Sequence, residues 1–261
     1  MHLTYRLVVY LLSVCLLAVA AFALLTLAKA KSKPTKLVIS KETTYITQPL
    51  TKDGYPDYVG AINRRLGEGV TAQNNANVLF WMAHGPHPEG TTMDSPFFKL
   101  MGVEAPPEEG DYFVRLDRYL IDQAQIEPSD PKWDEFWDDF AEQETRVTSR
   151  PWKAKDYPQI SKWLKANETP LALVIAGAQR PKYFSPLVAK PGGLLALYLP
   201  FVQARRAFGR ALAARAMLRV GEGRVEAAWD DLLACHRLGR LVGRGSTLGE
   251  SWVETPSIRW L

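Results

Sequence analysis

The amino-acid sequence predicts a mainly α-helical protein held at a membrane by one N-terminal helix, with one or two short strands opening the helical body. Three observations support this fold class. Residues 7–28 form 22 consecutive positions without a charged side chain. Apolar residues recur at helical spacing through most of the chain that follows. Two alanine-rich helical segments, 200–220 and 224–241, flank a glycine-containing turn, which indicates a C-terminal αα-hairpin.

Length and composition narrow the class of protein. The chain has 261 residues, of which 47% are hydrophobic and 23% charged, enough for one or two packed domains. The 32 basic and 28 acidic residues give a formal net charge of +4, too balanced for a dedicated nucleic-acid binder, so we expect no nucleic-acid partner. Two cysteines exclude a disulfide framework and a four-cysteine zinc site.

The uncharged segment 7–28 is long enough to cross a membrane. A helix rising about 1.5 Å per residue would span roughly 33 Å here, and the hydrocarbon core is about 30 Å thick. A cleaved signal peptide is the alternative, and residues 28–30 fit its A-x-A pattern, but its apolar region usually has about 7–15 residues. We expect an uncleaved single-pass anchor between a short basic N-terminus, 1–6, and a basic linker, 29–36.

The charges around the anchor leave its orientation open. Four lysines follow the anchor and one arginine precedes it, which by the positive-inside rule places the body in the cytoplasm. An N-terminal apolar segment with a basic start is also how most exported, anchored domains begin. We expect an exported body, with the cytoplasmic orientation as the alternative.

The helical body, 37–245, is expected to open with short strands. Residues 37–39 and 43–47 are rich in β-branched and aromatic side chains, which favours one or two strands. A helix is predicted at 57–66. A second helix is predicted to begin at Thr71, a good N-cap residue, and to end before Gly85.

This opening resembles one found in a group of uncharacterised bacterial proteins. The resemblance lies in Ile39-Ser40-Lys41-Glu42-Thr43-Thr44-Tyr45-Ile46-Thr47, in Asp53-Gly54-Tyr55-Pro56-Asp57-Tyr58-Val59, and in Gly69-Val70-Thr71 with Asn74-Asn75-Ala76. It implies an N-terminal anchor and a fold in common with that group. It implies no activity and no catalytic residue.

The middle of the chain is acidic and the remainder is basic. Segment 104–145 has 14 acidic and 3 basic residues, whereas 146–261 has 19 basic and 8 acidic residues. The two segments could pack together and partly neutralise each other. Alternatively, they form a bipolar surface that recruits partners of opposite charge.

An aromatic helix is predicted inside the acidic segment. Asp130-Pro131 is a strong helix start, and four aromatic residues follow at i, i+3, i+4 and i+7. We expect these side chains in the core and the intervening carboxylates on a solvated face. The aromatic residues are Trp133, Phe136, Trp137 and Phe140.

Helices are also predicted at 157–166 and 169–178, ahead of the hairpin. The second hairpin helix, which includes residues 223–229, resembles the second helix of a tetratricopeptide repeat, although no second copy follows at 34 residues. After residue 245 the periodicity ends, and 246–261 is expected to be an irregular tail. Whether the chain is truncated there is left open.

Two clusters in the sequence contain residue types that carry chemistry in other proteins. His84 and His87 lie on a Pro/Gly loop, and Glu89 and Asp94 could complete a three-ligand set for a hydrolytic metal. A loop with two solvated histidines is the favoured interpretation. Cys235 adjoins His236, but neighbouring helical residues point about 100° apart. Cys235 continues the apolar stripe of its helix, so we expect it in the core.

No catalytic or cofactor-binding motif is present in the sequence, and we expect no cofactor. The favoured function is a membrane-tethered helical scaffold or protein-interaction module of the cell envelope, with a protein partner. One alternative is a membrane-anchored, metal-dependent hydrolase that uses His84 and His87. The other is an anionic-lipid binder that uses the hairpin arginines. These are Arg205, Arg206, Arg210, Arg215, Arg219, Arg224, Arg237, Arg240 and Arg244.

Overall fold

A computed structural model of the chain describes residues 37–87, 93, 95–188, 201–245, 247 and 250. The predicted anchor, the basic linker and nearly all of the C-terminal tail lie outside these residues. Within the described part, no helix is long and apolar enough to cross a membrane. The chain divides into two compact units, Met1–Asp57 and Tyr58–Leu261, which are described separately.

The described part of the first unit consists of turns, so the predicted strands at 37–39 and 43–47 are wrong. Ser40 organises these turns. Its carbonyl oxygen accepts hydrogen bonds from Thr44 N at 3.0 Å and Thr44 Oγ1 at 3.1 Å, and its hydroxyl accepts from Glu42 N at 3.2 Å. Short hydroxyl side chains offer the backbone local partners in place of a strand ladder. The one bridge described in this unit joins Leu50 and Pro56.

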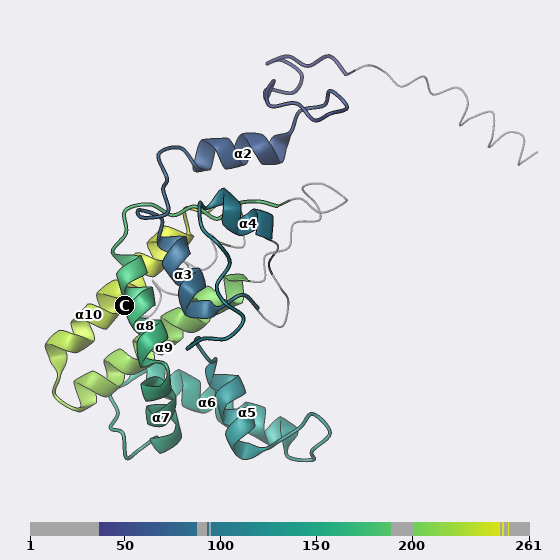
Figure 1. Cartoon of the computed structure of the whole chain (residues 1–261). Helices are drawn as coiled ribbons and strands as arrows, with labels where there is room; N and C mark the ends of the chain where they lie inside the picture. Colours follow the sequence, from purple (N-terminus) through teal and green to yellow (C-terminus); the bar gives the residue numbers. More distant parts are fainter. Residues whose placement is uncertain are drawn as a thin grey trace, which may run out of the picture. The chain divides into compact units, whose positions relative to one another are not determined.

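The described part of the second unit is helical, which confirms the prediction of a mainly α-helical body (Figure 1). The three predicted helices at 57–66, 157–166 and 169–178 agree with the structure to within one residue. The helices are α2 (Tyr58–Leu66), α3 (Ala76–His84), α4 (Ser95–Leu100), α5 (Leu116–Ala124), α6 (Trp133–Ser149), α7 (Pro158–Ala166), α8 (Glu168–Ala178), α9 (Phe201–Gly221) and α10 (Val225–Val242).

The core of this unit lies where α3, α8, α9 and α10 pack together. α3 packs against α8, and α10 packs against both α8 and α9. The close approach of α3 and α8 requires a glycine, because a Cβ at Gly177 would lie 2.6 Å from Phe80 Cε1. Phe80 and Phe208 are fully buried, with ring centroids 6.5 Å apart.

Helix α3 begins later than the sequence indicates. Thr71, the predicted N-cap, instead forms a turn with Asn74, whose side chain accepts from Thr71 N at 2.7 Å. The N-cap is Asn75, whose side-chain oxygen accepts from Asn77 N at 3.1 Å. Asn75 also accepts from Phe184 N at 3.0 Å, so a tertiary contact fixes the start of the helix.

The predicted αα-hairpin is confirmed. A cluster of ion pairs with a buried carboxylate joins its two helices. Asp231 of α10 is fully buried and accepts two hydrogen bonds from Arg215 of α9, at 2.6 and 3.0 Å. Arg219 of α9 binds the same carboxylate at 2.7 Å. The turn after α9 passes through Gly223, whose φ of 79° suits glycine.

Candidate functional site

A pocket of about 210 Å³ lies between α6 and α9, closed by the first residues of α5 and by α7. We call it the α6–α9 pocket. Aromatic rings form part of its lining and charged side chains the rest. The lining residues are Arg115, Leu116, Asp117, Trp137, Phe140, Glu144, Trp163, Gln203, Ala207 and Arg210.

The α5 side of the pocket is held by hydrogen bonds from α7 and from the residue that follows it. Trp163 Nε1 donates to Val114 O at 2.7 Å. The Asn167 side chain accepts from Val114 N at 2.8 Å and donates to Val114 O at 3.1 Å. Asn167 and Trp163 are both buried, so these bonds are shielded from competing water. They fix the backbone just before Arg115.

The aromatic residues of α6 lie between core and solvent, so the prediction that they form core is correct only for Phe140. All four rings are half-buried. Phe140 packs against the hydrophobic core, whereas the other three rings contact mainly one another. The Trp137 and Phe140 centroids are 5.4 Å apart. The reason is that α6 packs mainly against α9, and its fully buried residue, Val147, lies in its last turn, far from the aromatic residues at the other end.

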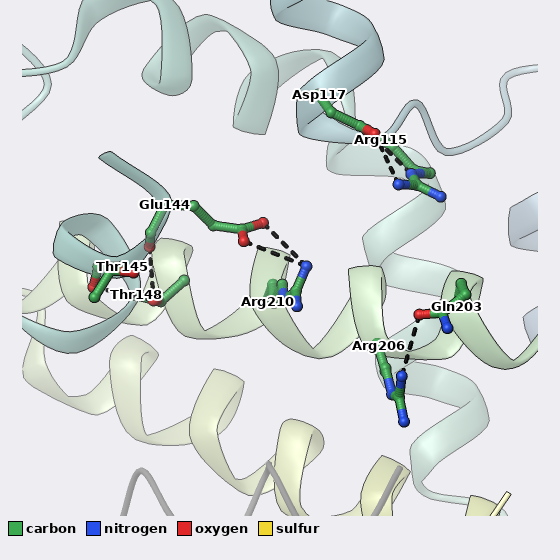
Figure 2. A network of polar contacts seen from close by, with 8 residues as sticks. All are labelled: Arg115, Asp117, Glu144, Thr145, Thr148, Gln203, Arg206 and Arg210. Carbon is green, nitrogen blue, oxygen red and sulfur yellow. Dashed lines mark hydrogen bonds and ion pairs between the residues drawn. The ribbon is translucent and has the colours of Figure 1, made fainter. Parts of the chain in front are cut away.

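Ion pairs from three helix regions form the polar part of the pocket, as Figure 2 shows. Arg115 donates to both carboxylate oxygens of Asp117, at 3.0 and 2.7 Å. Arg210 of α9 lies 3.3 Å from a carboxylate oxygen of Glu144 on α6. These two arginines and two carboxylates carry no net formal charge together.

Glu144 sits in a partly desolvated position. Burial raises the pKa of its carboxyl group above the usual value, and the nearby Arg210 opposes this shift. Asp117 raises this pKa further and Arg115 lowers it, so both ion pairs influence one carboxyl group. The Arg210–Glu144 pair also joins the acidic segment of the chain to the basic segment. This contact supports partial neutralisation of the two segments.

The histidine loop does not form a metal site within the described residues. His84 ends α3, and burial together with Arg205 lowers its pKa to about 4. His87 is exposed and pairs with Glu108. No three His, Cys, Asp or Glu side chains of the described part lie close enough together to hold a metal ion. Glu89 and Asp94 lie outside the described residues, so the four-residue set stays a prediction.

Cys235 packs against the hydrophobic core, as its place on the apolar stripe predicts. Burial, together with the Asp231 carboxylate, raises the pKa of its thiol to about 11. Its Sγ donates to Gly209 O at 3.6 Å. A thiol with so high a pKa is protonated near neutral pH and is a poor nucleophile.

The hairpin arginines do not form one basic surface. Arg205 and Arg215 are buried, and Arg210, Arg219 and Arg224 pair with carboxylates. The Arg205 guanidinium lies 5.3 Å from the Phe80 ring centroid and donates to Asn77 Oδ1 at 3.0 Å. Among the nine arginines, Arg237, Arg240 and Arg244 are exposed and have no ion-pair partner in the described part of the chain.

The sequence does not single out the residues of the pocket as a group. Arg115, Glu144 and Arg210 are far apart in the chain, and each looks like an ordinary surface charge. The aromatic spacing of α6 was the available signal, because it places Trp137 and Phe140 on the same face of the helix. Comparisons of the chain with protein-family models, with curated proteins and with solved structures gave no match. The resemblance to a bacterial group therefore stays a prediction.

Proposed function

We propose that the protein is a membrane-tethered helical module that binds a protein partner of the cell envelope, and that the α6–α9 pocket receives one side chain of that partner. The observation that supports this proposal is the lining of the pocket. Aromatic rings that are only half-buried stand beside two ion pairs on a fixed helical frame.

The size of the pocket favours one inserted side chain over a whole small molecule. Ligand and cofactor sites commonly have volumes of about 300–1,000 Å³. The α6–α9 pocket, at about 210 Å³, is smaller. Protein interfaces concentrate their binding energy in a few side chains that fill well-packed pockets on the partner. A single aromatic or large aliphatic side chain suits this space.

The polar side of the pocket suits a peptide. Trp137 and Phe140 offer ring surfaces to an apolar side chain. Around them, guanidinium groups can donate to peptide carbonyls and carboxylates can accept from peptide N–H groups. Because Arg115 and Arg210 are both paired with carboxylates, the pocket has no excess charge to favour an anion or a cation.

A surrogate ligand tests the pocket. The probe is N-acetyltryptophanamide, a blocked amino acid with an indole side chain, added to the full chain in detergent and observed by saturation-transfer NMR. Ala207→Leu fills the pocket from α9 and should abolish the transfer signal. Ala213→Leu adds the same volume to α9 outside the pocket lining and should leave the signal unchanged. Equal signals from both variants, or none from the wild type, would contradict the proposal.

A further inference from the structure

The outer face of α10 presents apolar side chains to solvent. Val225 is 62% exposed and Trp229 is 64% exposed, one helical turn apart. Tryptophan is mostly buried in folded proteins and is enriched at the centres of protein interfaces. The opposite face of α10 packs against α8 and α9. This outer face is separate from the α6–α9 pocket.

Charges on the same face of α10 are divided between its two ends. Glu226 and Asp230 lie near the N-terminal end, and Arg237, Arg240 and Arg244 lie at or just beyond the C-terminal end. All five are exposed, and none has an ion-pair partner among the described residues. Acidic residues beside Trp229 would be repelled by an anionic membrane, which argues for a protein occupant instead of a lipid surface.

The outer face of α6 has the same order of charges as α10, with acidic residues first and basic residues last. Its N-terminal and central part holds exposed carboxylates, and exposed arginines stand at its C-terminal end. These charges also have no ion-pair partner in the described part of the chain. The carboxylates are Asp134, Glu135, Asp138, Asp139 and Glu142, and the arginines are Arg146 and Arg150.

The two patterns match only when the helices run antiparallel. α6 has 17 residues and α10 has 18, so they can pair over their whole lengths. With their midpoints aligned, Arg237 falls opposite Asp138 and Arg240 opposite Glu135. Trp229 falls opposite Arg146, a cation that can lie over an indole ring. A parallel alignment would place carboxylates against carboxylates.

We infer that the chain self-associates, with the outer face of α10 on one copy bound antiparallel to the outer face of α6 on a second copy. Within one chain both faces are exposed, because α6 packs mainly against α9 and α10 packs against α8 and α9. The contact therefore forms between chains. Charge complementarity at both ends fixes its direction, and Trp229 supplies the apolar anchor.

Charge reversal in the full chain, purified in detergent, tests this contact by sedimentation velocity. Arg237→Glu with Arg240→Glu should weaken self-association about tenfold or more, because two attractive pairs become repulsive. Glu135→Lys with Asp138→Lys should have the same effect. Lys162→Glu with Lys165→Glu, on exposed positions of α7, is the matched control and should leave association unchanged. Thermal unfolding verifies that each variant is folded.

Two complementation experiments exclude a nonspecific effect of charge. A 1:1 mixture of the α6 variant and the α10 variant should associate again, because each supplies a face that matches the other. The chain with all four substitutions should also regain association. The inference is overturned if the wild type stays monomeric at every concentration reached, or if neither complementation restores association. Loss of binding to phosphatidylserine vesicles on Arg237→Glu with Arg240→Glu, without any self-association of the wild type, would assign α10 to lipid instead.

Discussion

His84 occupies an unusual position for an imidazole, at the buried end of α3. Its ring packs edge-on against Trp81 and Phe208, with centroid distances of 6.1 and 6.2 Å. Burial and the Arg205 guanidinium both disfavour its charged form and lower its pKa from 6.5 to about 4. The folded state therefore binds a proton at His84 more weakly than the unfolded state does.

This difference makes the free energy of unfolding depend on pH. The contribution of neutral His84 is fully present above about pH 6.5 and is lost as the pH falls to about 4, at a cost of roughly 3 kcal/mol. Urea denaturation between these pH values should show that loss, and His84→Phe should reduce it. NMR titration of the imidazole gives a direct check. A His84 resonance that titrates near pH 6.5 would contradict the proposed environment.

The roles of single residues were predictable only where they depend on local spacing. Cys235 could be placed against the core because it continues an apolar stripe. The burial of Arg205 could not, because arginine is usually exposed and two of the three rings around it, Phe80 and Trp81, belong to α3, far away in the chain. The pairing of Arg210 with Glu144 was also not predictable, because the two residues lie 66 positions apart in the chain.

At the scale of helices, the sequence predicts well which segments are helical. It predicts poorly the residue at which a helix begins. Hydrophobic periodicity identifies α2, α7, α8 and the α9–α10 hairpin, because a helix repeats the same geometry along its length. The start of α3 depends on Asn75 bonding to Phe184, which the local sequence does not encode. The segment 37–47 has strand-like composition, but Ser40 and its neighbouring hydroxyls bind the backbone into turns.

Two glycines of α9 should respond oppositely to alanine. A Cβ at Gly221 would lie 1.9 Å from Trp152 O, and that backbone segment is fastened to α9 by Trp152 Nε1 donating to Ala214 O at 3.2 Å. Gly221→Ala should therefore destabilise the protein by about 1–3 kcal/mol. At Gly209 the nearest atom is Cys235 Sγ, at 3.7 Å. Gly209→Ala should stabilise it by up to about 1 kcal/mol, since alanine favours helix.

Urea denaturation of the two variants measures both effects under one set of conditions. The urea concentration at the unfolding midpoint should be lower than the wild-type value for Gly221→Ala and higher for Gly209→Ala. If Gly221→Ala unfolds at the wild-type midpoint, the close contact between α9 and the Trp152 segment does not exist in solution.

At the scale of the whole chain, the proposed tether determines where a partner can be found. Protease treatment of intact cells that express a C-terminally tagged chain tests the tether, together with mass spectrometry of the N-terminus. An exported, uncleaved protein should be digested from outside and should retain Met1. Protection until the inner membrane is opened would place the body in the cytoplasm and show that the linker lysines set the orientation. A new N-terminus after residue 30 would show that 7–28 is a cleaved signal.

The central claim is that the α6–α9 pocket holds a side chain of a protein partner, and site-specific cross-linking in cells tests it most directly. A photoreactive residue replaces Gln203, an exposed position on the pocket lining, or Lys165, an exposed position on α7 away from it. The account predicts a discrete cross-linked product from position 203 that disappears with Ala207→Leu, and no such product from position 165. The same products from both positions, or a product from position 203 that persists when the pocket is filled, would contradict it.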